Sequence, residues 1–445
     1  MDITAKPGSP FADPSFTLGV ATSSFQIEGG ADGREPCIWD TFCEQPGKIA
    51  DGSHGLEACD HINLWQDDIE LIASLNVDAY RFSISWPRII RADGSVNQEG
   101  LDFYIGILDA LTQRNIKAYV TLYHWDLPQY LEDEGGWLNR KTAYAFAEYV
   151  DVVTKAFGDK VYSYATLNEP FCSAYLGYEV GVHAPGKVGK EYGKKAVHHL
   201  LLAHGLGMKV LRKNVPDIES GIVLNFTPFY PASDTDKDKA ATKLAHDHFN
   251  DWYIRPIIEG EYPGLLETLP PEHCPLIEDG DMETISQPID FLGVNYYTRA
   301  KVQDDGSEDP KQLDPPADCE KTAMGWEVYP QGLTDLLLQL HNDYRLPPLL
   351  ITENGLASDD HLIDGVVNDE QRIRYLQTHM DAVSEAVKQG VNITGYFVWS
   401  LLDNFEWALG YEKRFGIVYV DYETQKRTLK NSALAFREML AKRKK

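Results

Sequence analysis

Short apolar runs rich in β-branched and aromatic residues alternate along the chain with longer stretches whose apolar residues recur at helical spacing. Stretches 64–76 and 101–115, for example, repeat apolar residues every three or four positions, which predicts amphipathic helices. The runs that we predict to be strands lie at residues 16–29, 79–86, 116–126, 161–170, 220–226, 289–298, 347–355 and 393–405. Strands that alternate with helices in this way are typical of parallel β-α-β units.

The predicted strands are spread over the whole of the 445 residues, and no Gly/Ser-rich or Pro-rich linker divides them. This pattern predicts an α/β fold with one domain over residues 1–445, a single (β/α)8 barrel whose core covers about residues 16–440. An open sheet split into lobes is the alternative. Residues 180–193 and 302–321 are the least regular, and we predict elaborated loops there that wall the active-site face. The second segment is rich in Asp but lacks the spacing of a calcium loop, which favours a solvated loop.

The run "PPLLITENG" at residues 347–355 ends in an unusual way. Asn354-Gly355 after an apolar run is typical of a β-hairpin turn. The residues that follow are polar and acidic, however, with no sustained alternation that would predict a second strand. We therefore expect Glu353 at the carboxyl end of a strand that has no hairpin partner.

Polar and aromatic residues stand at or near the ends of other predicted strands as well. They are Gln26 and Glu28, Arg81, His124 with Trp125 and Asp126, Asn168 with Glu169, Asn295 with Tyr297, and Trp399. In a (β/α)8 barrel the carboxyl ends of the strands converge on one face, where the active site is built. One such residue alone is usually a cap or a turn former, but so many strand ends of this kind favour a shared site.

The net charge of the chain makes some classes of ligand less favourable than others. The formal net charge is -27, which argues against nucleic acid and against an anionic membrane surface, because cationic side chains supply most of the binding to both. It favours a small neutral or cationic ligand, although solubility alone also explains an acidic chain. The segment "MDITAKPGSPFADPSF" lacks the basic patch and apolar core of a secretory signal, and no run is long and apolar enough to span a bilayer. We therefore expect a soluble, cytoplasmic protein.

Cysteine and histidine give no sign of a metal centre. The 6 cysteines include no CxxC pair, so free thiols are expected. The histidines of "VHHLLLAHG" and "AHDHF" lack the helical His pair with a partnering Glu that binds zinc. We predict no metal and no cofactor.

Two of the carboxylates at strand ends suit hydrolysis of a glycosidic bond. That reaction needs one acid that protonates the leaving oxygen and a second carboxylate that attacks or activates water. Glu169 and Glu353 are the candidates. Pro170 predicts an extended backbone at Glu169, and Asn168 supplies an amide for a sugar hydroxyl. Aromatic rings on which a sugar can stack also lie in or beside these loops, although core packing explains each of them alone; they are Trp125, Trp326, Trp399 and Trp407.

These motifs together resemble those of a known family. They are "FQIEG", "YRFSISW", "LYHWDLP", "TLNEP", "NYYT", "ITENG" and "WSLLDNFEWALGYEKRFG". All stand in the order found in the β-glucosidases of glycoside hydrolase family 1, and the resemblance extends from about Phe16 to the last predicted helix. It implies a retaining enzyme that acts by double displacement.

The resemblance also implies a role for each matching residue. Glu353 would be the nucleophile and Glu169 the acid/base, while Asn168 would hold the 2-hydroxyl next to the cleaved bond. Arg81 and Tyr297 match residues that hold and orient the nucleophile. The further substrate-binding positions are Gln26, His124, Trp125, Glu406 and Trp407 for the other hydroxyls, Trp399 as a stacking floor, Trp326 at the mouth, and Asn295 and Phe415 in the same pocket.

The expected substrates are small neutral β-glucosides. The family resemblance implies cleavage of terminal non-reducing β-D-glucosyl residues from cellobiose, short cello-oligosaccharides and aryl or alkyl β-glucosides. It also implies some β-galactosidase or β-fucosidase activity, because Gln26 and Glu406 meet the 4-hydroxyl and tolerate both epimers in this family.

Three alternatives stay open. In 6-phospho-β-glycosidases of the same family, Ser, Lys and Tyr stand at the positions of Glu406, Lys413 and Phe415. Glu406 and Phe415 argue against a phosphate, whereas Lys413 matches the phosphate pattern. A non-catalytic sugar-binding relative would be expected to lack one of the two glutamates, and this chain has both. Transfer of the glycosyl group to a sugar instead of water is the third alternative.

Overall fold

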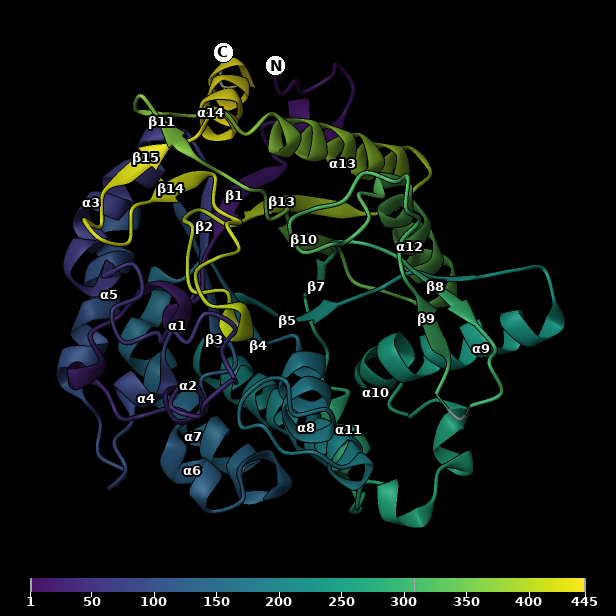
Figure 1. The fold of residues 1–445 in the computed structure, drawn as a ribbon. Coiled ribbons are helices and arrows are strands. Elements are labelled where there is room, and N and C mark those ends of the chain that lie inside the picture. Colours follow the sequence, from purple (N-terminus) through teal and green to yellow (C-terminus); the bar gives the residue numbers. More distant parts are fainter. Residues whose placement is uncertain (1, 308, 444–445) are drawn as a thin grey trace.

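The computed structural model describes residues 2–307 and 309–443. Its centre is a closed barrel of eight parallel strands in the spatial order β1-β13-β10-β7-β5-β4-β3-β2 (Figure 1). These strands are β1 (Thr17–Ala21), β2 (Ala79–Ser83), β3 (Lys117–Tyr123), β4 (Ser163–Asn168), β5 (Glu219–Asn225), β7 (Phe291–Asn295), β10 (Leu349–Asn354) and β13 (Ile393–Trp399). Each run that we predicted to be a strand contains one of them, except that β5 begins one residue before its run, so the predicted (β/α)8 barrel is confirmed.

Helices surround the barrel (Figure 1). They are α1 (Ser24–Ile27), α2 (Ile38–Cys43), α3 (His61–Ser74), α4 (Trp86–Ile89), α5 (Gln98–Gln113), α6 (Gln129–Asp133), α7 (Lys141–Phe157), α8 (Lys190–Asn214), α9 (Asp236–His246), α10 (Trp252–Ile258), α11 (Asp281–Ile285), α12 (Pro330–Asp343), α13 (Glu370–Lys388) and α14 (Asn431–Arg443). Helices α3 and α5 correspond to the predicted helical stretches, and they bury apolar residues at helical spacing, such as Ile69 with Ile72 and Leu108 with Leu111. Among the described residues, no helix is long and apolar enough to cross a bilayer.

Side chains fill the inside of the barrel. Each strand contributes at least one residue to a single buried cluster, which contains Ala21, Ala79, Tyr119, Ala165, Val223, Phe291, Leu350, Phe397 and Trp399. Large and small side chains share this layer, and the rings of Tyr119 and Phe397 pack edge to face with centroids 4.9 Å apart. Packed layers of this kind are typical of (β/α)8 barrels. They leave the carboxyl ends of the strands as the place for a ligand.

The first and last predicted strands are shorter than expected. β1 ends at Ala21, and the residues after it turn into α1, which carries Gln26. β13 ends at Trp399, and the segment that follows is irregular because its backbone hydrogen bonds go to several different parts of the chain, such as the bond from Leu401 N to the carbonyl of Ala21 at the end of β1 (3.0 Å). Both runs contain further apolar residues beyond the strand, and these segments are buried as well.

Several regions contain strands that we did not predict. Segment 302–321 holds β9 (Lys311–Leu313) and the end of β8 (Ala300–Gln303); β8 pairs with β9 on one side and with β6 (Phe229–Pro231) on the other. Residue 308 lies outside the described residues. Segment 180–193 is a loop only to residue 189, where α8 begins. Short two-stranded sheets also join β11 (Leu362–Ile363) to β12 (Val366–Val367) and β14 (Val418–Val420) to β15 (Arg427–Leu429). Strands of two or three residues are too short for alternation to reveal them.

Gly355 is needed for close packing and not for a hairpin turn. A Cβ atom at this position would lie 1.8 Å from the carbonyl oxygen of Trp399, so the end of β10 can approach the end of β13 only without a side chain. Asn354 still belongs to β10, and its amide donates to the carbonyl of Tyr296 (2.8 Å). The expectation that Glu353 lies at a strand end without a hairpin partner is therefore confirmed.

A buried cluster of charges ties helices α13 and α14 to the loops that follow β10 and β13. It consists of Arg372, Arg414, Lys430, Asp360, Asp369 and Asp403, and we call it the Arg372 cluster. Arg372 donates to Asp369 (2.5 Å) and to Asp360 (2.8 Å). Lys430 donates to Asp360 (2.5 Å) and to Asp403 (2.7 Å). Buried ions remain compatible with a stable fold when each is paired and hydrogen-bonded, as these are.

The Arg372→Met substitution should destabilise the protein strongly. It leaves Asp360 and Asp369 buried with fewer cationic partners, and removing one partner of a buried ion pair typically costs about 3–5 kcal/mol. The matched control is Arg374→Met on the same helix, whose pair with Glu320 (3.1 Å) involves side chains 44% and 47% exposed. Exposed pairs contribute less than about 1 kcal/mol. Urea denaturation of both variants measures the difference, and equal losses would contradict the prediction.

Candidate active site

Two buried glutamates lie at the carboxyl ends of barrel strands. Glu169 directly follows β4, and Glu353 is the penultimate residue of β10. The two residues are only 6% and 4% exposed, so their charges interact through protein more than through water.

A chain of hydrogen bonds connects the two carboxyl groups. Arg81 Nη1 donates to Glu353 Oε1 (2.8 Å), and Arg81 Nη2 donates to Asn168 Oδ1 (2.7 Å). The same Oδ1 accepts a bond from Asn295 Nδ2 (3.2 Å), which also donates to Glu169 Oε1 (2.7 Å). Four different strands, β2, β4, β7 and β10, supply these groups or the residue before them. The strand ends thus converge as expected for a barrel.

The two glutamates have different electrostatic surroundings. Glu353 pairs with the guanidinium of Arg81 and accepts a further bond from the hydroxyl of Tyr297 (2.6 Å). Glu169 accepts bonds from neutral groups, Asn295 Nδ2 and Cys172 Sγ (3.1 Å). Burial, followed by the charge of Glu353, raises the pKa of Glu169 to about 8. Glu169 is therefore mostly protonated at neutral pH, next to a carboxylate that is paired with a cation.

The hydrogen bonds around Asn168 define the tautomer of His124. A guanidinium can only donate, so Asn168 turns its Oδ1 toward Arg81 and its Nδ2 toward His124 Nε2 (3.1 Å). Nε2 is then an acceptor and the ring proton is on Nδ1. Burial and the charge of Arg81 lower the pKa of His124 well below its usual value, so the ring is neutral. Nδ1 has no partner among the described residues and is available to a ligand.

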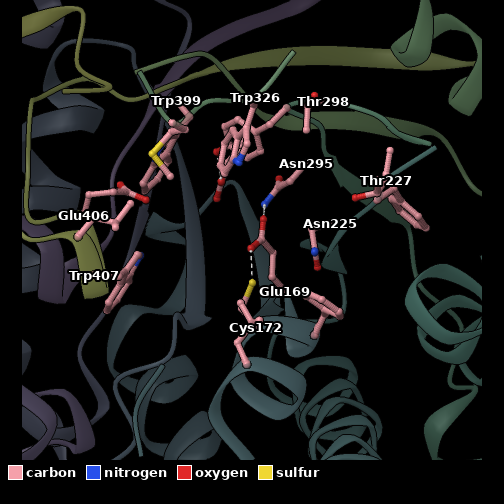
Figure 2. Close-up of a pocket in the computed structure, with 18 of the residues that line it drawn as sticks. Glu169, Cys172, Asn225, Thr227, Asn295, Thr298, Trp326, Trp399, Glu406 and Trp407 are labelled. Atoms are coloured by element: carbon pink, nitrogen blue, oxygen red, sulfur yellow. Dashed lines mark hydrogen bonds between the residues drawn. The ribbon is translucent and has the colours of Figure 1, made fainter. Parts of the chain in front are cut away.

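A cavity of about 590 Å³ opens beside these groups. Figure 2 shows Trp399, Glu406 and Trp407 on one side of it and Asn225 and Thr227 on the other, with Glu169 and Asn295 between them. The predicted site residues that line it are His124, Trp125, Glu169, Asn295, Tyr297, Trp326, Glu353, Trp399, Glu406, Trp407 and Phe415. The segments predicted to wall the site contribute His183 and Leu313.

Three predicted residues lie behind the cavity wall. Gln26, Arg81 and Asn168 are 0%, 2% and 1% exposed. Gln26 accepts a bond from Ser23 Oγ (2.5 Å) and donates to the carbonyl of Phe405 (2.9 Å). All three reach the cavity through hydrogen bonds to residues nearer its surface.

A third carboxyl group belongs to the same cavity. Gln26 Nε2 donates weakly to Glu406 Oε2 (3.5 Å). Burial, followed by the charges of Glu353 and Glu169, raises the pKa of Glu406 to about 8. The three carboxyl groups therefore cannot all be ionised without strong mutual repulsion.

Backbone strain is concentrated around this cavity. Trp125, Glu169 and Trp407 have φ angles of +77°, +47° and +50°, in the left-handed region that residues with a Cβ rarely adopt. The extended backbone that we predicted for Glu169 is therefore wrong. Backbone hydrogen bonds from Glu169 N to Val223 O (2.9 Å) and from Cys172 N to Glu169 O (2.9 Å) hold the residue there against its local preference.

The sequence analysis missed residues that support the site. Cys172 contacts Glu169, Thr352 Oγ1 donates to Asn295 Oδ1 (2.6 Å), and Asn404 Oδ1 accepts a bond from Gln26 (3.0 Å). Cys172 was detectable in principle, because it stands three residues after Glu169 and such residues meet when the chain turns. All six cysteines are free thiols. The described residues contain no group of three or more His, Cys, Asp or Glu that could hold a metal ion.

Comparisons with known proteins agree with this geometry. Residues 10–445 match the family model described as Glycosyl hydrolase family 1. Beta-glucosidase A of Thermotoga maritima is 48% identical over 423 residues, which are 94% of this chain and 95% of that protein. A bifunctional beta-D-glucosidase/beta-D-fucosidase of Bifidobacterium breve is 42% identical over 96% of this chain and 97% of its own.

A solved structure is similarly close. Virulence factor SghA from Agrobacterium tumefaciens, in complex with its substrate analog salicin, has a TM-score of 0.94 and 44% identity, and the match covers 98% of this chain and 99% of that one. The resemblance of the motifs is confirmed by sequence and by fold, and the chain belongs to glycosyl hydrolase family 1.

Proposed function

We propose that this protein is a retaining β-glucosidase that removes terminal non-reducing β-D-glucosyl residues from small neutral β-glucosides. The observation that carries the proposal is the contrast between the two glutamates. Glu353 is bound to a cation and to a hydroxyl, as a nucleophile should be, whereas Glu169 is held by neutral donors and has a raised pKa, as an acid should. Hydrolysis of β-glucosides as a general activity agrees with the names of the relatives.

In the first step, one oxygen of ionised Glu353 attacks the anomeric carbon and forms a glycosyl ester. Glu169 gives its proton to the glycosidic oxygen, so that the leaving group departs as a neutral alcohol. Tyr297 and Arg81 keep the attacking carboxylate oriented during this step. The proposed separation of the two carboxyl groups is about 5 Å, which leaves no room for water between nucleophile and sugar.

In the second step, water hydrolyses the ester. Glu353 has lost its charge in the ester, and that charge is one of the causes that raise the pKa of Glu169. The pKa of Glu169 therefore falls, and Glu169 becomes a base that takes a proton from the attacking water. Release of glucose restores ionised Glu353 and protonated Glu169, so the cycle closes without a cofactor.

The residues proposed to bind the sugar surround these two groups. His124 offers its free Nδ1–H, and we assign the 2-hydroxyl to Asn168. We assign Trp399 as the ring on which the sugar stacks, and the remaining hydroxyls to Gln26, Trp125, Glu406 and Trp407. Asn295, which contacts both Asn168 and Glu169, completes the set.

The outer part of the cavity suits a range of leaving groups. The ring centroids of Trp326 and Tyr297 are 5.6 Å apart, and those of Trp326 and Phe415 are 6.3 Å apart. Further apolar side chains line the cavity, namely Phe171, Leu176, Phe226, Leu313 and Met324, beside polar ones such as Arg299 and Gln312. Such a wall favours aryl and alkyl β-glucosides and also accommodates the second glucose of cellobiose or of a short cello-oligosaccharide. Some β-fucosidase or β-galactosidase activity is part of the proposal, and the bifunctional relative supports it.

Replacement of the proposed nucleophile provides the first test. Glu353→Ala should lower kcat on p-nitrophenyl β-glucoside on the order of 10⁴-fold or more, because no group of the protein can then form the ester. Added azide should restore turnover and give α-glucosyl azide, since azide enters the space that the carboxylate occupied. Glu385→Ala on the surface of α13 is the control and should keep wild-type activity. A β-glucosyl azide product, or an active Glu353→Ala enzyme without azide, would contradict the assignment.

The pH dependence of kcat/KM tests the role of Glu169. Glu169 must be protonated in the first step, and its pKa is about 8, so kcat/KM should fall above about pH 8. Glu169→Gln keeps an oxygen for Asn295 but has no proton to give, so it should lose this basic limb. The variant should be much slower on cellobiose than on 2,4-dinitrophenyl β-glucoside, whose leaving group needs little protonation. A basic limb that survives in Glu169→Gln would show that another group causes it.

A phosphorylated substrate separates this function from a 6-phospho-β-glycosidase. Burial, followed by repulsion among the three carboxyl groups, already raises the pKa of Glu169 and of Glu406, and a phosphate dianion would add further negative charge to this cavity. Lys413 is half-buried and is not among the described residues that line the cavity. We expect kcat/KM for the 6-phosphate to be at least about 100-fold below that for the unphosphorylated p-nitrophenyl β-glucoside. Preference for the phosphate would favour the alternative.

A further inference from the structure

The thiol of Cys172 touches the proposed acid/base and has no role in the mechanism above. Its Sγ lies 3.1 Å from Glu169 Oε2, and the residue lines the cavity. Figure 2 shows Glu169 between Asn295 on one side and Cys172 on the other, with a hydrogen bond to each. Each carboxyl oxygen of Glu169 therefore has its own neutral partner.

The fold fixes the position of this thiol. After Glu169 the chain reverses, and Cys172 N donates to the carbonyl of Glu169 (2.9 Å). Cys172 then begins a π-helix, η5 (Cys172–Glu179), which lies against α8. π-Helical turns are rare and occur frequently at functional sites. The turn brings two side chains that are three residues apart into contact.

The hydrogen bonds determine which oxygen of Glu169 carries the acidic proton. Thr352 Oγ1 donates to Asn295 Oδ1 (2.6 Å), so the amide of Asn295 turns its Nδ2 toward Glu169 Oε1. Nδ2 can only donate, and Oε1 must accept. The proton of neutral Glu169 is therefore on Oε2, the oxygen that faces Cys172.

From this geometry we infer that Cys172 is a positioning residue for the acid/base step, an inference that rests on the proposed function. It holds Oε2 in place in both protonation states of Glu169. Sulfur is a weak acceptor, so it leaves the Oε2 proton available to the glycosidic oxygen of the substrate. When that proton has moved to the leaving group, the S–H donates to the ionised Oε2. A stronger acceptor at this position would compete with the substrate for the proton.

Electrostatics keep the thiol in the form that this role needs. Burial, followed by the charge of Glu169, raises the pKa of Cys172 well above its usual value, so the S–H is retained. Other titratable groups also lie close to Glu169. Some of them contribute to its pKa, and the others line the same cavity. They are Glu353 of β10, Glu406 after β13, Arg81 of β2, His124 after β3, Tyr297 after β7 and His183 after η5. Substitution of Cys172 leaves all of them in place.

Two substitutions of Cys172 should move the basic limb of the kcat/KM profile in opposite directions. Cys172→Ser supplies a stronger donor to ionised Oε2 and should lower the pKa of the limb by about 0.5–1 unit, whereas Cys172→Ala removes the donor and should raise it by a similar amount. Cys274→Ser, at a half-buried thiol outside this cavity, is the matched control and should keep the wild-type profile. A purely structural role would change activity or stability without opposite shifts in pKa.

The outcomes separate this inference from the proposed function. If Glu169→Gln loses the basic limb but both Cys172 variants keep it at the wild-type pH, the role of Cys172 is overturned and the function stands. If the limb survives in Glu169→Gln, the assignment of Glu169 fails, and the role of Cys172 fails with it. Shifts of both Cys172 variants in the same direction also overturn the inference.

A measurement on the wild-type enzyme covers the case in which the variants do not fold. Infrared difference spectra across the basic limb should show one S–H stretching band that moves to lower frequency as Glu169 ionises, because an S–H bond weakens when it donates to a carboxylate. The same spectra of Cys274→Ser should contain that moving band as well. Absence of any S–H band that titrates with the limb would overturn the inference.

Discussion

The ion pair between Arg81 and Glu353 is the interaction on which the chemistry of this site depends. The cavity brings three carboxyl groups together, and the guanidinium of Arg81 contacts one of them. One cation cannot compensate three carboxylates in a buried site. Burial, followed by the charge of Glu353, raises the pKa values of the remaining two, Glu169 and Glu406. The difference between the proposed nucleophile and the proposed acid thus follows from which glutamate Arg81 reaches.

The barrel makes this arrangement possible because it fixes each group on a different strand. Arg81 divides its donors between Glu353 and Asn168, so both terminal nitrogens of the guanidinium are hydrogen-bonded. Below it, the packed layer that contains Phe397 and Tyr119 occupies the inside of the barrel. Electrostatic interactions are stronger in such a place than at an exposed strand end.

The sequence was informative about the barrel and about which residues gather at its strand ends. Strands buried on both faces give continuous apolar runs, and these runs predicted every barrel strand. Glu169 and Glu353 could be singled out because a charged residue at the end of an apolar run is unusual. The partners of these residues were harder to predict. Whether Asn295 faces Glu169 depends on a side-chain bond from Thr352, and the contact of Cys172 depends on the positive φ of Glu169, which the local sequence disfavours.

Distant parts of the fold support the strain within the site. Positive φ angles at Trp125, Glu169 and Trp407 each cost about 1–3 kcal/mol, and such conformations persist only where the surrounding structure holds them. The Arg372 cluster provides part of that support, because two of its members stand directly beside site residues. Asp403 precedes Asn404, the partner of Gln26, and Arg414 precedes Phe415 of the cavity wall. The charges that anchor the last two helices therefore also restrict the loop that carries Glu406 and Trp407, so the geometry of the proposed sugar-binding wall depends on residues that lie outside the cavity.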